Sequence, residues 1–192
     1  MFVIGIVLGT MLLFAGCAEY EEGAGTKNSI VVHADQSIDA TMLRTFDQSY
    51  YSEDELVSMV NEELKNYNSE YGADAITVNS HSLSGQQVSL TLHFHSWEDY
   101  NRYMLDRIYV GTVQGAYDER YDFNQALSYA DDKEHTIGKN DLMNMADQKI
   151  IVFAGDHSVE TPDKIRFYTQ GMKLTGAKNV ESGVDGLYFI IY

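Results

Sequence analysis

Two histidines lie two residues apart in a segment where apolar and polar residues alternate. His93 and His95 take polar positions in the stretch 87–95. In a β-strand this alternation buries one face and points both imidazoles to the other, about 7 Å apart, where they could share a metal ion. A third ligand is needed, and the predicted hairpin places the candidate His81 opposite Gln87, roughly 20 Å from His93. We therefore expect solvated histidines, with a metal at His93 and His95 as the alternative.

A second group of reactive residue types follows the apolar run Ile150–Phe153. Residues 155–158 read Gly-Asp-His-Ser, and loops that follow strands often hold catalytic groups. Adjacent side chains diverge, however, so these residues cannot form a hydrolase relay among themselves. The sequence also lacks a Gly-x-Ser-x-Gly elbow. We interpret the segment as a turn, with catalysis by Asp156 and His157 as the alternative.

Tyrosine is abundant, with 14 in 192 residues. Because the ring is apolar and the hydroxyl polar, tyrosine suits both recognition surfaces and boundary positions between helix and sheet. The sequence favours boundary packing and leaves open a surface that recognises a protein, a peptide or a glycan. The tyrosines expected on such a surface are Tyr100, Tyr103, Tyr117 and Tyr121.

The one cysteine of the sequence, Cys17, follows sixteen residues that carry no charge, MFVIGIVLGTMLLFAG. As a helix this run would span roughly 24 Å, less than the roughly 30 Å hydrocarbon core, which is typical of a signal peptide. The string LFAGC, residues 13–17, resembles the lipobox of bacterial lipoprotein precursors. The resemblance implies a lipid thioether on Cys17, cleavage before it, and anchoring at the extracytoplasmic face of the cell membrane.

Composition narrows the function further. The sequence holds 13 Lys and Arg against 29 Asp and Glu, a formal net charge of −16. This charge argues against nucleic-acid binding and against electrostatic docking on anionic lipid, so the membrane is reached through the lipid on Cys17. With that thiol lipidated, none remains for redox or thiolate zinc chemistry, and we expect no cofactor.

These observations predict a non-catalytic, lipid-anchored, extracytoplasmic binding or interaction module of unknown ligand. The alternative is a cell-surface hydrolase or metal-dependent enzyme. Residues 1–16 are the expected signal peptide, and 17–28 an acidic and Gly-rich tether. The remaining 192 − 28 = 164 residues, 29–192, suffice for a single domain with one core.

The order of the helices and strands that we expect along the sequence predicts an α+β fold. Its sheet should be antiparallel or mixed, with helices packed mainly on one face. The clearest helix begins at Ser52, where Glu55 completes a capping box, and ends at Gly72. Its apolar stripe is Leu56, Val60, Leu64 and Tyr67. A second helix is expected after Ser96.

Sheet residues flank these helices. Strands are expected at 29–34, 38–46, 149–154, 164–169, 172–175 and 187–192, with 150–153 buried on both faces. A hairpin with a three-residue loop at 83–85 should pair Val78 with Leu90 and Ile76 with Leu92. The middle of the chain predicts a helix over 117–130, a loop over 131–140 and a short helix over 141–146.

Overall fold

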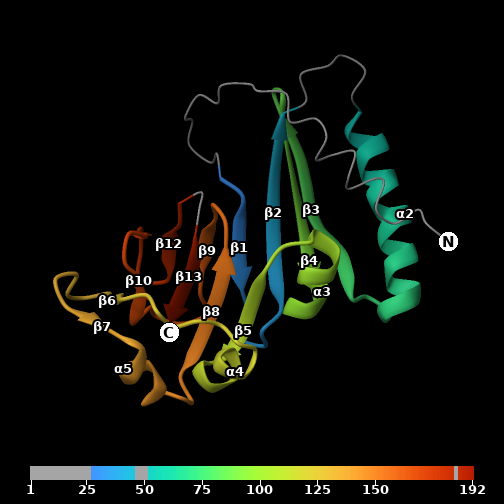
Figure 1. The fold of residues 1–192 in the computed structure, drawn as a ribbon. Coiled ribbons are helices and arrows are strands. Elements are labelled where there is room, and N and C mark those ends of the chain that lie inside the picture. The colour runs from blue at the N-terminus through green and yellow to red at the C-terminus, as the bar shows by residue number, and fades with distance from the viewer. Residues whose placement is uncertain (1–26, 46–51, 184–185) are drawn as a thin grey trace.

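The computed structural model describes residues 27–45, 52–183 and 186–192, which form two sheets and four helices (Figure 1). Sheet A holds, in spatial order, β11 (Lys173–Leu174), β12 (Asn179–Glu181), β9 (Ser158–Glu160), β1 (Ser29–Val32), β2 (Ile38–Thr45), β4 (Gln87–Phe94) and β3 (Ile76–Ser84). Sheet B holds β5 (Ile108–Thr112), β8 (Lys149–Ala154), β13 (Leu187–Ile191), β10 (Phe167–Thr169), β6 (Leu127–Tyr129) and β7 (Thr136–Ile137). The fold is α+β and mostly sheet, with two sheets in place of the single one expected.

Sheet A is mixed, because β1 lies between an antiparallel neighbour and a parallel one. Ser29 is opposite Thr41 of β2 and beside Ser158 of β9. Neighbouring strands of sheet B are all antiparallel. The pairing joins the start of the described chain to a strand about 130 residues later, and no local sequence pattern reports such a contact.

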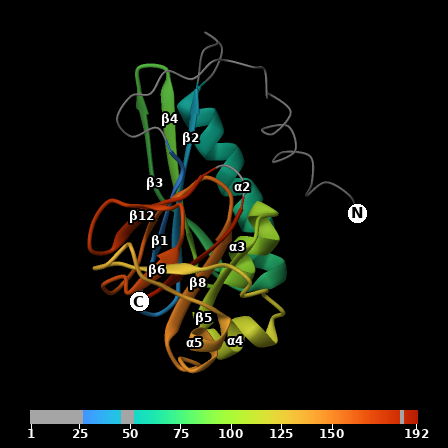
Figure 2. The same cartoon turned by 60° about the vertical axis from the view of Figure 1, so that its left-hand side comes forward.

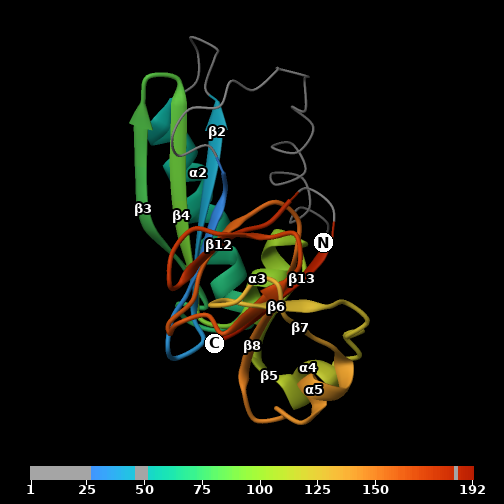
Figure 3. The ribbon, with the colours of Figure 1, turned by 90° about the vertical axis from the view of Figure 1, so that its left-hand side faces the viewer.

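The four helices are α2 (Glu53–Tyr71), α3 (Trp97–Met104), α4 (Val113–Asp118) and α5 (Lys139–Met143). Figure 2 shows α2 and α3 together on one side of β2, β3 and β4. Figure 3 shows α4 and α5 apart from α2, beside β5 and β8. The helices therefore pack on two separate parts of the molecule, whereas the sequence predicted that they would pack mainly on one face of a sheet. None of the helices in the described ranges has the length and apolar character needed to cross a membrane.

Helix α2 forms where the sequence predicts it. The Ser52 side chain accepts a hydrogen bond of 3.3 Å from the backbone N–H of Glu55, which caps the first turn. Gly72 ends the helix at φ +135°, a conformation that favours glycine. The buried face consists of the predicted stripe: Leu56, Val60, Leu64 and Tyr67. The local signals of capping and period were sufficient here.

The β3–β4 hairpin has a shorter loop than predicted. Ser84 pairs with Gln87, so two residues form the loop, and the first of them, Gly85, has φ +61°. Glycine at the first position is typical of a two-residue hairpin loop. The predicted three-residue loop is therefore wrong.

A bulge in β3 reconciles this loop with the burial of the strand. Val78 pairs with Leu92 and Ile76 with Phe94, each two residues further along β4 than predicted. Asn79 is the extra residue, because the register shifts between Val78 and Ser80. Without it a two-residue loop would turn Ile76 towards solvent, whereas Ile76 is fully buried.

The middle of the chain departs most from prediction. Helix α4 ends at Asp118, and residues 127–129 form strand β6 instead of a helix. Pairs of apolar residues two positions apart, Tyr121 with Phe123 and Leu127 with Tyr129, suit an extended chain better than a helix. Within the expected loop, residues 136–137 form β7, and the short helix starts two residues early, at Lys139. The strands β5, β9 and β12 were missed.

Sheet B is buried on both faces, as the run Ile150–Phe153 predicts. Ile151 and Phe153 belong to a core shared with sheet A, α2 and α3. Ile150 and Val152 belong to a second core beneath α4 and α5. The two cores share the strand β8. Sheet A has one buried face only, since alternate residues of β4 are buried and the polar residues between them lie on the outward face.

Candidate functional site

His93 and His95, the sequence's metal candidates, do not act together. His93 lies on β4, directly opposite Asp39 of β2, on the face of sheet A turned away from the core. His95 lies beyond the end of β4 and is exposed. Its ring is not among the ligand atoms that converge on His93 in the part of the chain that the structure describes.

His93 instead meets His33 and Asp39. The Nδ1 atom of His93 lies 2.6 Å from one Asp39 carboxylate oxygen, and the Nε2 atom of His33 lies 3.1 Å from the other. The two imidazole rings are 6.1 Å apart, and one ligand atom from each residue lies within 4.8 Å of the others. Two imidazoles and one carboxylate thus form one partly exposed cluster on this face of the sheet.

Neighbouring side chains hold this group in place. The amide of Asn79, the bulge residue of β3, donates a hydrogen bond of 2.9 Å to Asp39. His33 begins a tight turn, in which its N–H bonds the carbonyl of Ser37 at 2.9 Å. Asp35 accepts from the Ser37 hydroxyl at 2.7 Å, and that hydrogen bond lowers the pKa of Asp35. The carboxylate is therefore oriented before any ligand arrives, and the turn fixes the backbone that carries His33.

His81 lies elsewhere than the sequence suggests. It pairs with Leu90 rather than Gln87, because the loop has two residues instead of three and begins at Gly85. Its Nδ1 atom lies 2.7 Å from a carboxylate oxygen of Glu53, at the start of α2. This contact places His81 on the helix side of the hairpin, so it contributes nothing to the group around Asp39.

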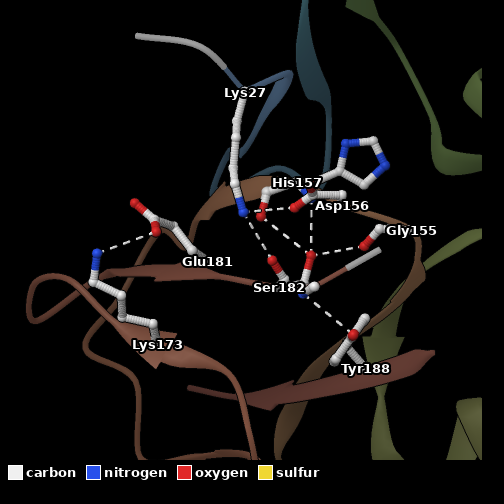
Figure 4. Close-up of polar contacts among 9 residues, drawn as sticks. Lys27, Gly155, Asp156, His157, Lys173, Glu181, Ser182 and Tyr188 are labelled. Atoms are coloured by element: carbon white, nitrogen blue, oxygen red, sulfur yellow. Dashed lines mark hydrogen bonds and ion pairs between the residues drawn. The ribbon is translucent and has the colours of Figure 1, made fainter. Parts of the chain in front are cut away.

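The loop after β8 separates its two candidate catalytic residues (Figure 4). The Asp156 carboxylate lies 2.6 Å from the Lys27 ammonium, while the His157 ring points away from both. Ser182 fixes the loop: its hydroxyl donates to the carbonyl of Gly155 at 2.7 Å and accepts from the N–H of His157 at 2.9 Å. Asp156 and His157 share a loop without sharing a site, as the sequence reasoning expects of adjacent residues.

The His157 ring lies behind this loop, near Asp106. The His157 Nε2 atom is 3.5 Å from Asp106, whose carboxylate also accepts from the Tyr100 hydroxyl at 3.1 Å and from the backbone N–H of Arg107 at 2.7 Å. Burial raises the pKa of Asp106, but these donors outweigh burial and leave that pKa below its ordinary value. The Nδ1 atom of His157 is buried without a hydrogen-bond partner among the described residues.

The tyrosines expected on a recognition surface are mostly internal. Tyr100, Tyr103 and Tyr121 are 1%, 8% and 7% exposed, and only Tyr117 of the four is exposed. Tyr100 and Tyr103 both lie near Phe94, where α3 meets β4, and burial raises the pKa of each. The expected surface is therefore corrected to boundary packing for these three residues.

A shallow groove of about 480 Å³ lies between α2 and β3. The side chains that line it are partly apolar and partly polar or charged, and the latter include Asn61, Lys65, Asp74 and Thr77. The Asn68 amide binds both the N–H and the carbonyl of Ile76, at 3.0 and 2.8 Å, and so ties the helix to the strand at its floor. The groove offers hydrogen-bonding groups and no cluster of histidines.

Sequence reasoning missed two of the three converging residues. His33 and Asp39 flank a tight turn, and Asp39 takes a polar position between the buried residues Ile38 and Ala40. That alternation was a usable signal for its face. The pairing of β2 with β4, which brings Asp39 beside His93, has no signature in the local sequence.

A scan against protein-family models and searches of curated proteins and of solved structures found no match for this chain. The function therefore has to be argued from its own residues. Cys17, residues 1–16 and most of the expected tether lie outside the described residues.

Proposed function

We propose that this chain is a lipoprotein, held at the extracytoplasmic face of a cell membrane by lipid on Cys17, whose folded body acts by binding rather than by catalysis. The observation that carries the proposal is the position of the one cysteine of the sequence, directly after an uncharged run that ends in Ala15 and Gly16. Two or more acyl chains hold a protein stably on a membrane, and a lipobox lipid supplies that number.

The arrangement of the body supports binding over catalysis. Asp156 is paired with Lys27 in the part-buried loop, and the Nδ1 atom of His157 is enclosed. A general base must reach its substrate's proton directly or through one water molecule. Asp156 and His157 contact different partners and do not face a common point, so they could not act on one substrate together. This weighs against the hydrolase alternative.

Two surfaces of the described body are available to a ligand. One is the polar face of sheet A around Asp39, and the other is the groove between α2 and β3. Three of the four tyrosines expected to recognise a protein, peptide or glycan are buried and cannot contact a ligand. These two surfaces are therefore the better candidates for ligand binding.

The anchor is tested by expressing the full chain in a bacterium that processes lipoproteins, with a labelled fatty acid in the medium. The wild-type chain should carry label and fractionate with membranes, and Cys17→Ala should lose both. Gly16→Ala keeps a small residue before the cysteine and should keep both. Label or membrane retention that persists in Cys17→Ala contradicts the proposal.

A further inference from the structure

The polar face of sheet A carries a convergence of side chains that the anchoring and binding proposal does not explain. His33, Asp39 and His93 come from three adjacent places in the sheet: the end of β1, the start of β2 and the end of β4. A carboxylate on a solvent-facing position can be hydrated by water and needs no side-chain partner. Here, however, an imidazole nitrogen lies next to each of the two Asp39 oxygens.

We infer that His33, Asp39 and His93 bind a divalent transition-metal ion, with zinc as the representative probe. The inference deepens the proposed binding function by naming a ligand class, and it does not depend on the lipid anchor. Nothing in the comparisons assigns such a site.

The three residues can reach one ion, because one ligand atom from each lies within 4.8 Å of the others. Zn–N and Zn–O bonds of about 2.0–2.2 Å place tetrahedral ligand atoms roughly 3.3 Å apart. The nitrogen of His33 is 3.1 Å from one Asp39 oxygen, and that of His93 is 2.6 Å from the other. An ion bound between them would take the place of the hydrogen atoms in these contacts, and each neutral imidazole can carry its one N–H on the ring nitrogen that faces away from the ion.

The ligand types select the ion. Imidazole with carboxylate suits zinc, copper or nickel, whereas calcium and magnesium prefer sites built from oxygen atoms alone. The net charge of −16 also raises the local concentration of cations around the chain. Three ligands and an open solvent side leave a fourth coordination position for water or for a donor from another molecule.

The surrounding residues supply the outer shell that metal sites need. Asn79 bonds the Asp39 carboxylate and fixes its orientation. The side chains of His33, His93 and Asp39 are 41%, 35% and 16% exposed, so an ion can enter from solvent without the fold opening. The site is oriented and accessible at once.

The other histidine–carboxylate contacts lack this convergence. His81 with Glu53, His135 with Asp132 and His157 with Asp106 each bring one imidazole to one carboxylate. Two ligands hold an ion far less well than three, so these pairs serve as internal controls on the same chain.

The test is calorimetric titration of Zn²⁺ into the full chain in detergent, using Cys17→Ala as the parent because it removes the one thiol that would compete for zinc. We expect one zinc ion per chain. His33→Ala, Asp39→Asn and His93→Ala should each weaken binding about 100-fold or more, and Asn79→Ala about tenfold. His81→Ala and His95→Ala should bind as the parent does.

A second measurement guards against misfolding. Zinc should raise the thermal unfolding midpoint of the parent and leave that of His93→Ala unchanged, while both unfold alike without metal. Equal zinc affinity of His93→Ala and parent, no heat at millimolar zinc, or equal competition by Ca²⁺ would each overturn the inference. Because the parent cannot be lipidated, failure of zinc binding leaves the anchor standing, and failure of the anchor leaves the metal site standing.

Discussion

Two regions of this molecule pair histidine with aspartate, and they differ in how far the histidine side chain is exposed. On the polar face of sheet A, His93 and His33 meet Asp39 with side chains that are 35% and 41% exposed. Behind the loop after β8, His157 meets Asp106 with a side chain that is 13% exposed, and its ring lies 6.2 Å from that of Phe153.

We expect burial to decide the role of such a pair. The part-exposed histidines can bind an ion from solvent without disturbing the core. His157 cannot, because its Nδ1 atom is enclosed and its Nε2 atom faces a carboxylate already bound by Tyr100. The same two residue types therefore offer a ligand site in one region and structural support in the other.

The largest effect that separates the two regions should come from His157→Ala. The change removes a mostly buried ring that lies near Phe153 and leaves Asp106 with fewer donors, which should cost about 2 kcal/mol of unfolding free energy. Urea unfolding followed by circular dichroism measures the loss.

The matched control is His135→Ala. His135 also contacts an aspartate, at 2.5 Å, but its side chain is 76% exposed. Its loss should change the unfolding free energy by less than about 0.5 kcal/mol. Equal costs for the two variants would show that burial is not what distinguishes these pairs.

A smaller effect, tied to pH, is expected for Asp106→Asn. The folded pKa of Asp106 lies below its ordinary value of 3.8, so the ionised carboxylate stabilises the native state at pH values above that. The variant should be less stable than wild type by about 1 kcal/mol at pH 7. The gap should close as pH falls below 3.8 and through the lowered folded pKa, since both chains are then neutral at this position.

Unfolding of both chains at several pH values between 7 and 2.5 tests this sign. A gap that stays constant or widens in acid contradicts the assigned role of the Asp106 carboxylate. Tyr100→Phe, which removes one donor and keeps the ring, should give a smaller gap with the same pH dependence.

The smallest effect is expected for His93→Ala without metal. Because its ring is part-exposed and its contact with Asp39 is screened by solvent, the unfolding free energy should change by less than about 0.5 kcal/mol. Thermal unfolding in the presence of a chelator measures it. A loss near that of His157→Ala would mean that the exposed group holds the fold together, against the comparison.

The sequence allowed prediction of the elements whose signals are local. The capping residues and apolar period of α2 and the apolar run of β8 gave bounds close to those observed. The region 117–130 failed because its apolar residues are spaced for an extended chain that packs under sheet B, and that packing depends on strands far away in the sequence. The second sheet could not be inferred for the same reason.

The candidate site was half visible for a related reason. His93 stood out by its strand phase, but its partners His33 and Asp39 are reached only through the pairing of β2 with β4. The orienting residue Asn79 comes from a bulge, which the predicted three-residue loop had made unnecessary. Long-range register decided which polar residues meet.

The parallel pairing of β1 with β9 has a consequence for the order of folding. Sheet A holds its earliest strand, residues 29–32, between β2 and a strand that begins at residue 158. The sheet cannot close until most of the chain has been synthesised, and such distant pairings form slowly. Until β9 has been made, the edge of β1 that will pair with it has no partner strand. During synthesis, therefore, the first-made part of sheet A exposes an unpaired strand edge.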